Sequence, residues 1–110
     1  MEGYIGRTEW KEGRVKNFFG KDLLSLDNGS VKLVRVVSQA IYPEHIHPDR
    51  TEYVYVLKGF PNFQIDQEEF SAKPDEFYVF PSKVKHAIRN YCDSECLLLV
   101  GNIKDIDTGL

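Results

Sequence analysis

The strongest constraint on the fold is that β-branched and aromatic residues occur in short runs separated by Gly, Pro, Asn and Asp. Such runs predict short β-strands, and no segment has the periodicity of a convincing helix. The expected strands cover residues 23–26, 31–40, 52–58, 63–65, 69–72, 76–80, 86–90 and 96–103. Asp27-Asn28-Gly29 is the best turn signal, because Asn-Gly readily supplies the positive φ angles of a two-residue hairpin. The pattern predicts an all-β sandwich or barrel.

Length and composition predict one folding unit. The 110 residues are expected to form a single domain, 1–110, whose ends, 1–9 and 105–110, are the least ordered parts. With 42% hydrophobic and 28% charged residues, the chain is neither a disordered polymer nor a membrane protein. A formal charge of −3 without basic blocks argues against nucleic acid as a partner. Because no segment resembles a membrane span or a signal peptide, we expect a cytoplasmic protein.

Two of the three histidines, His45 and His47, are two residues apart in a segment that reads as extended. Alternate residues of a strand share a face, so both imidazoles would point the same way. After a turn-forming stretch, Glu52 begins the next strand and could return beside them, and His86 could complete the group. Imidazole nitrogen and carboxylate oxygen together suit divalent transition metals. The His-x-His pattern alone, however, also occurs on solvated strand faces.

The spacing around these histidines follows two motifs. From His45 the chain reads His-x-His-x4-Glu-x6-Gly, and from Pro81 it reads Pro-x4-His-x3-Asn. These segments, about 41–59 and 75–90, resemble the two signature motifs of the cupin superfamily. The resemblance implies a cupin-type double-stranded β-helix, or jelly-roll barrel, with a metal site between two sheets. It also implies one divalent transition metal, Fe, Mn, Zn or Ni, bound by His45, His47, Glu52 and His86.

Three glycines of the family pattern are replaced in this chain. The leading glycine of the first motif falls on Gln39, and the two of the second motif fall on Asp75 and Lys83. Asp tolerates a left-handed backbone, so Asp75 is easily accommodated. Lys83 would be strained at positive φ, so we expect the loop before His86 to differ from the usual shape in the family. The remaining spacer positions of the motifs are matched by Gly59, Pro81 and Asn90.

Strand alternation predicts what surrounds the site. Val54 and Val56 share a face with Glu52, and Ile88 shares one with His86, so a ligand would meet aliphatic walls.

The opposite face of the 52–58 strand carries Tyr53, Tyr55 and Leu57 and is too apolar for open solvent. Another sheet or a second subunit should cover it, and the resemblance to cupins favours a homodimer. Arg35 would point inward, toward a carboxylate or phosphate, if residues 31–47 formed one strand. The alternative, which we favour, is an exposed Arg35 after a bulge near Pro43.

Two functions are compatible with these residues. The first is a mononuclear metal-dependent enzyme, of dioxygenase or isomerase/epimerase type, acting on a small oxygen-rich molecule. The second is a non-catalytic module that binds a metal and a small molecule as a sensor or store. A general acid or base beside the metal would distinguish them, and the weak candidates are Tyr42, Tyr91, Glu44 and Glu76. Cys92 and Cys96 are expected to be reduced, with Cys96 packed as a small hydrophobe; a redox pair is the alternative.

Overall fold

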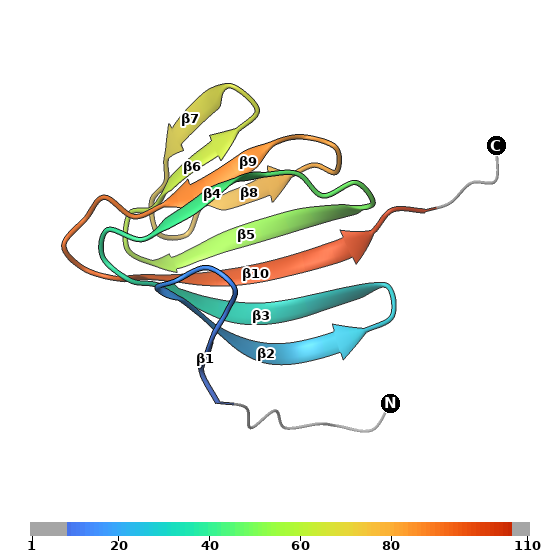
Figure 1. Cartoon of the computed structure of the whole chain (residues 1–110), viewed down its shortest axis with the longest axis horizontal. Coiled ribbons are helices and arrows are strands. Elements are labelled where there is room, and N and C mark those ends of the chain that lie inside the picture. Colours follow the sequence, from blue (N-terminus) through green and yellow to red (C-terminus); the bar gives the residue numbers. More distant parts are fainter. Residues whose placement is uncertain (1–8, 107–110) are drawn as a thin grey trace.

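The computed structural model describes residues 9–106 as ten β-strands in two antiparallel sheets (Figure 1). The strands are β1 (Lys11–Glu12), β2 (Phe18–Leu26), β3 (Gly29–Val36), β4 (Ile41–His45), β5 (Arg50–Lys58), β6 (Asn62–Ile65), β7 (Glu68–Ser71), β8 (Phe77–Phe80), β9 (His86–Arg89) and β10 (Cys96–Lys104). All eight predicted strands are present with shifted ends, and β1 and β4 are additional. Within residues 9–106, no helix is long and apolar enough to cross a membrane. The predicted poorly ordered ends fall mostly outside the described residues.

The two sheets enclose a common core. The larger sheet has the order β1-β2-β3-β10-β5-β8 and the smaller one has β4-β9-β6-β7. Phe63 and Ile88 of the smaller sheet belong to the same buried cluster as Val54, Val56 and Leu98 of the larger sheet. Alternate residues of each strand therefore face inward, as the period of a β-strand requires. The predicted all-β architecture is confirmed.

The hairpin of β2 and β3 forms at the predicted place, but its turn differs from the prediction. The turn residues are Asp27 and Asn28 rather than the Asn-Gly pair, and neither has positive φ. Gly29 is needed for a different reason, because a Cβ atom there would lie 2.5 Å from the carbonyl oxygen of Asn102. The Asn28 carbonyl oxygen also accepts a 2.8 Å hydrogen bond from the backbone N–H of Lys104. Close packing against β10, not left-handed backbone, explains this glycine.

The predicted strand 31–40 ends early, and this break settles the orientation of Arg35. Strand β3 stops at Val36, and Gln39 has a φ of 66° in the turn that leads to β4. The inward orientation proposed for Arg35 is therefore wrong. Its guanidinium bonds to the carboxylate of Glu95 at 3.2 and 3.1 Å and lies 5.3 Å from the ring centre of Trp10. The favoured alternative is supported in part: Arg35 points away from the core but is half-buried beside Glu95, and β4 has a register shift near Pro43.

The outer face of β5 and β8 is apolar and partly open to solvent. Tyr53 pairs with Val79, and Tyr55 pairs with Phe77, in the register of these two strands. The side chains of Leu57, Val79 and Phe77 are 41%, 46% and 57% exposed. No other sheet covers this face within residues 9–106, so the first of the two predicted alternatives is wrong for the described chain. Cover by a second subunit stays a prediction.

Gly59 and Cys96 show how tightly the motif-closing turn packs. Cys92 and Cys96 are both free thiols, and Cys96 is fully buried, as expected for a small hydrophobe. Burial raises the pKa of the Cys96 thiol. Gly59 has a φ of 90°, and a Cβ atom there would lie 2.8 Å from the Cys96 sulfur and 2.9 Å from its Cα. Both backbone conformation and space therefore require glycine at this position.

We expect Gly59→Ala to lower the free energy of unfolding by about 3 kcal/mol, from left-handed strain together with overpacking against Cys96. Urea unfolding followed by tryptophan fluorescence measures this loss. Gly13→Ala is the matched control, because its new methyl would meet only the Phe18 carbonyl oxygen at 3.7 Å. The control should change stability by less than about 0.5 kcal/mol. Equal losses in the two variants would contradict this account of Gly59.

Candidate metal centre

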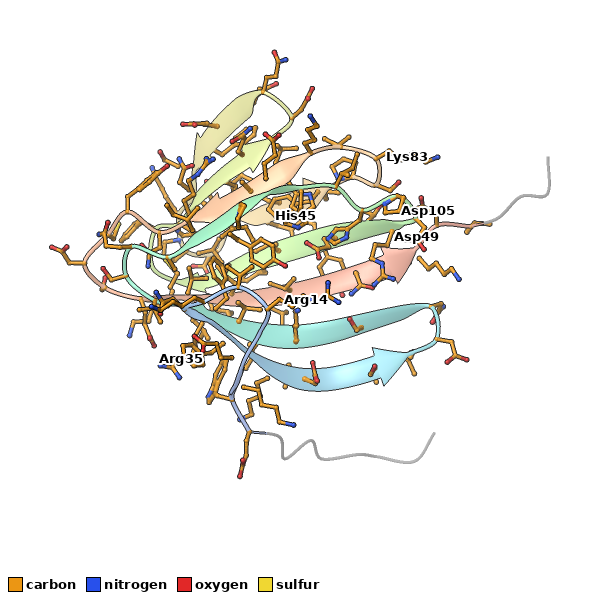
Figure 2. All side chains as sticks on the ribbon, in the orientation of Figure 1. Arg14, Arg35, His45, Asp49, Lys83 and Asp105 are labelled. Atoms are coloured by element: carbon orange, nitrogen blue, oxygen red, sulfur yellow. The ribbon has the colours of Figure 1, made fainter. Side chains whose placement is uncertain are left out.

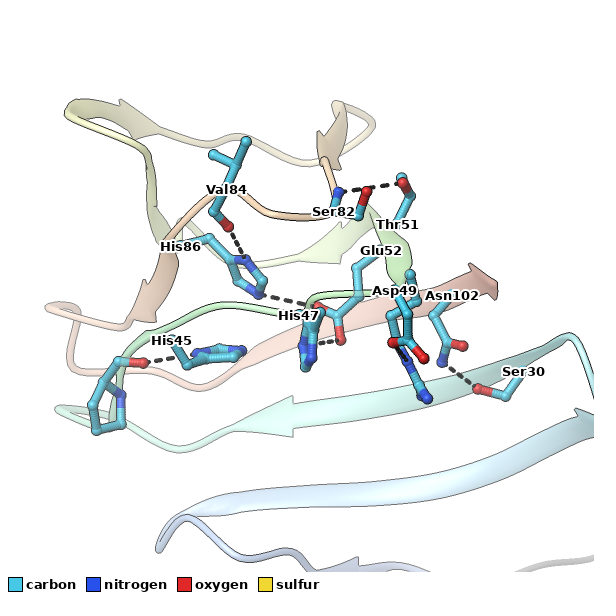
Figure 3. A network of polar contacts seen from close by, with 12 residues as sticks. Ser30, His45, His47, Asp49, Thr51, Glu52, Ser82, Val84, His86 and Asn102 are labelled. Carbon is cyan, nitrogen blue, oxygen red and sulfur yellow. Dashed lines mark hydrogen bonds and ion pairs between the residues drawn. The ribbon is translucent and has the colours of Figure 1, made fainter. Parts of the chain in front are cut away.

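Four side chains meet between the two sheets (Figure 3). His45 ends β4 and His86 begins β9, and these two residues are register partners in the smaller sheet. Glu52 comes from β5 of the larger sheet, and His47 comes from the segment that joins β4 to β5. The turn-forming stretch after His47 returns the chain as the sequence suggested. The structure thus brings together the four residues that the sequence indicated.

The donor atoms of this group are close enough to share one ion. One potential ligand atom from each residue lies within 4.8 Å of the other three. The Glu52 carboxylate is placed between two imidazoles, with Oε1 at 3.2 Å from His47 Nε2 and Oε2 at 3.4 Å from His86 Nε2. The ring centres of His45 and His86 are 4.1 Å apart. Three nitrogen donors and one carboxylate therefore face a single point.

Backbone carbonyl groups fix the orientation of two rings. His45 Nδ1 lies 2.9 Å from the carbonyl oxygen of Pro43, and His86 Nδ1 lies 3.4 Å from that of Val84. A carbonyl oxygen can only accept, so in the tautomer that makes these bonds Nδ1 carries the proton and Nε2 keeps a free lone pair. This is the arrangement in which backbone partners orient histidine ligands in metal sites.

Two nitrogen atoms in the group are buried without a hydrogen bond. Among the described residues, His47 Nε2 and His86 Nε2 are buried side-chain atoms that have no hydrogen-bond partner, although Glu52 is near both. An unsatisfied buried polar atom is rare in folded proteins and calls for an explanation such as an ion. The mixed set of imidazole and carboxylate donors also suits a divalent transition metal. The residues present therefore fit the implied metal.

The electrostatic environment favours the protonation states that bind metal. Burial is the largest effect and lowers the pKa of His45, and the bond to the Pro43 carbonyl opposes it. The charges of His86 and His47 lower the pKa further, and the charge of Glu52 opposes them. Burial by itself would raise the pKa of Glu52, but the contact with His86 and the charges of all three histidines outweigh it and lower the pKa. A neutral imidazole and an ionised carboxylate are the forms that coordinate a metal.

A cavity of about 770 Å³ opens beside this group, with His45, His47 and Glu52 in its wall. The predicted lining by Val54, Val56 and Ile88 is correct only for Ile88. Val54 and Val56 face inward as predicted, but they are fully buried in the core and do not line the cavity. The apolar part of the wall is instead formed by Val15, Phe18, Phe19, Val34, Tyr42, Ile88 and Val100.

Position relative to the cavity distinguishes the four candidate acids and bases. Tyr42 lines it, with its ring centre 4.6 Å from that of His45. Tyr91 does not line it, and the other two candidates are engaged elsewhere. Glu44 accepts a 2.7 Å hydrogen bond from the side chain of Gln64, and Glu76 accepts bonds from the Lys73 backbone and the Tyr78 hydroxyl.

Four basic residues in the cavity wall were missed in the sequence. The cavity is lined by Lys11, Arg14, Lys32 and Arg50. Alternation along β3 could have identified Lys32, because it shares a face with the buried residues Val34 and Val36. Arg14 belongs to the segment between β1 and β2, which in Figure 2 passes in front of the larger sheet. No periodic pattern could have placed that segment at the site.

All three positions that replace family glycines have positive φ. The φ angles are 66° at Gln39, 72° at Asp75 and 64° at Lys83. Lys83 therefore has the positive φ at which a lysine is strained, and the expected difference between this loop and the usual shape in the family stays a prediction. The Lys83 N–H donates a 2.8 Å hydrogen bond to the carbonyl oxygen of His47. The strained residue thus ties the loop before His86 to the segment that carries His47.

The chain belongs to the cupin family, because a family model described as a cupin domain matches residues 32–101. This match includes the whole four-residue group. Among curated proteins, the polyketide synthase CurC from Streptomyces cyaneus is 34% identical over 56 residues, which cover 51% of this chain. The aligned part spans about a third of that relative, or 36% of its length.

Solved structures share the fold over most of the chain. KdgF from Halomonas sp. is similar with a TM-score of 0.84 and 16% identity, covering 98% of this chain and 99% of that one. A predicted oxalate decarboxylase from Thermotoga maritima has a TM-score of 0.82 and 18% identity, covering 92% and 99%. A sugar phosphate isomerase of the cupin superfamily from Silicibacter pomeroyi has a TM-score of 0.73 and 25% identity, covering 81% and 60%. The predicted cupin barrel is confirmed.

We expect Lys83→Gly to be more stable than Lys83→Ala by about 1 kcal/mol, because glycine removes the left-handed strain that alanine keeps. Thermal and urea unfolding of the two variants measure the difference. Lys58 in β5 offers the matched pair, where glycine should be less stable than alanine because it weakens a strand. The same sign at both positions would show that backbone strain at Lys83 does not limit stability.

Proposed function

We propose that this protein is a mononuclear metal-dependent cupin enzyme acting on a small oxygen-rich molecule. The observation that carries the proposal is a group of three histidines and one glutamate whose donor atoms converge at a cavity wall. The proposed ligands of the one divalent metal are His45, His47, Glu52 and His86. Two buried imidazole nitrogens without hydrogen bonds support this assignment. Bound there, the metal would supply Lewis-acid chemistry to the oxygen atoms of a substrate.

The protein residues have distinct proposed roles around that centre. Pro43 and Val84 hold two rings in the ligating orientation through their carbonyl groups. The apolar wall excludes water from the side of the cavity near Val34 and Val100. Tyr42, beside His45, is the residue best placed to hold or move a proton. An isomerase-type reaction is favoured over dioxygenation, because a sugar phosphate isomerase is among the similar structures at 25% identity.

The first test is metal stoichiometry. The purified protein should bind one divalent transition metal per chain, measured by elemental analysis after dialysis. Glu52→Gln and His47→Ala should each reduce occupancy below one tenth, since each removes a donor from a four-donor group. The variants each change one of the four proposed ligands, His45, His47, Glu52 and His86. Glu44→Gln is the control, because the Glu44 carboxylate accepts a hydrogen bond from Gln64 instead. Full occupancy in the ligand variants would refute the assignment.

The second test separates a catalytic from a structural metal. Protein loaded with Mn(II), Fe(II) or Zn(II) is assayed on a panel of hydroxy acids, keto acids and sugar phosphates. We expect turnover with Mn(II) or Fe(II), because an octahedral ion keeps open positions for substrate, whereas four donors saturate tetrahedral zinc. Oxygen consumption would indicate dioxygenation instead of isomerisation. Inactivity of all three loaded forms would favour the alternative, a non-catalytic binding or sensor module.

We also propose that the protein is a homodimer that uses the outer face of β5 and β8. The exposed side chains of Leu57, Phe77 and Val79 form an apolar surface of the kind that marks protein interfaces. Multi-angle light scattering at micromolar concentration should give twice the chain mass of 12.7 kDa. Phe77→Lys should convert the dimer to a monomer, whereas Leu26→Lys, at an exposed residue of the hairpin, should not. A wild-type monomer would contradict the proposal.

A further inference from the structure

Lys32 is a basic residue on the inner face of the larger sheet. It lies in β3 two residues before Val34, which is buried in the core, and strand alternation gives the two side chains the same face. Its register partner on β10 is Val100, which pairs with Val54 on β5. Glu52 is the inward-facing residue two positions before Val54. Strand spacing and the rise per residue therefore place the Cα atom of Lys32 about 10 Å across the sheet and about 7 Å along it from the Cα atom of Glu52.

Lys32 and Glu52 border one cavity, although they belong to different strands of the larger sheet. Lys32 and Glu52 line the same cavity, and the apolar side chains of Val34, Val100 and Tyr42 line it as well. Lys32 has no hydrogen bond or ion pair with another residue of the described chain, 9–106. The other cavity cations are less suitable, since Lys11 and Arg14 are exposed and Arg50 lies 3.5 Å from the carboxylate of Asp49. Lys32 is the half-buried cation of the wall.

The charge of the cavity wall depends on the metal. Its basic residues are Lys11, Arg14, Lys32 and Arg50, and its acidic residues are Glu9, Glu12, Asp22 and Glu52. These formal charges balance without a metal, and a divalent cation at the histidine group would leave the cavity positive. A positive, partly apolar cavity complements a small anion, and charge-assisted hydrogen bonds are the strongest that such a site can offer.

We infer that Lys32 binds the anionic group of a small ligand whose other oxygen atoms reach the histidine and glutamate group. The inference rests on the proposed function and gives its substrate class, a small hydroxylated compound that carries a carboxylate or a phosphate. Lys32 is thus a specificity-determining residue, because a neutral polyol of the same size would leave its ammonium group without a partner.

The test uses Mn(II)-loaded protein and three probes of similar size: glycerol, glycerate and glycerol phosphate. Binding is measured by calorimetry and by the relaxation of solvent protons near Mn(II). We expect at least one anionic probe to bind ten times or more tightly than glycerol, and the preferred probe distinguishes carboxylate from phosphate. Lys32→Met should remove this preference while metal content stays unchanged. Lys58→Met, at the exposed far end of β5, should keep the preference.

The outcomes separate the two proposals. A protein that binds no metal refutes the proposed function and this inference with it. Full metal binding with no anion preference, or with an equal preference in Lys32→Met, refutes the inference alone. Asp22 is the register partner of Lys32 on β2. If Lys32 only stabilised the fold beside Asp22, Lys32→Met would lower the thermal stability and leave the anion affinity unchanged. That result would also overturn the inference.

Discussion

The contact of the Glu52 carboxylate with two imidazoles is the constraint on which the arrangement of the site depends. Glu52 belongs to the larger sheet and His86 to the smaller one, so this contact spans the space between them. Buried polar atoms without hydrogen bonds cost about 1–3 kcal/mol each, and two such nitrogens lie here. The apolar core must offset that cost in the metal-free chain. A bound ion would recover it by binding the folded state alone.

Asn90 links the site to the rest of the barrel. Its fully buried side-chain amide donates to the carbonyl oxygens of Val36 and Ser94, at 3.1 and 2.9 Å, and its own oxygen accepts from the Cys92 N–H at 3.0 Å. These bonds anchor the end of β9, four residues after His86, to the end of β3. The second motif therefore contains both a candidate ligand and the residue that fixes the strand carrying it.

The sequence predicted the residues of the candidate metal site more completely than the residues that line the cavity beside it. Motif spacing is local, so it identified His86 and the three other members of the group. Alternation predicted correctly that Val54 faces inward, but alternation gives a face and not a depth. This residue is fully buried in the core and is not part of the cavity wall. Alternation along β3 gives the inward face of Lys32, but its position relative to Glu52 depends on pairing with β10, far along the chain. The orientation of Arg35 depended on where β3 ends, and the turn at Gln39 follows that end.

The place of β10 in the larger sheet has a consequence for synthesis. This strand lies between β3 and β5, yet the ribosome makes it after both. Until β10 emerges, β3 and β5 each present an unpaired edge, and unpaired edges favour association between chains. Its arrival joins two halves of the sheet whose pairing residues are distant in sequence, a topology associated with slow folding. The nascent chain is therefore most exposed to aggregation in the interval before its tenth strand is complete.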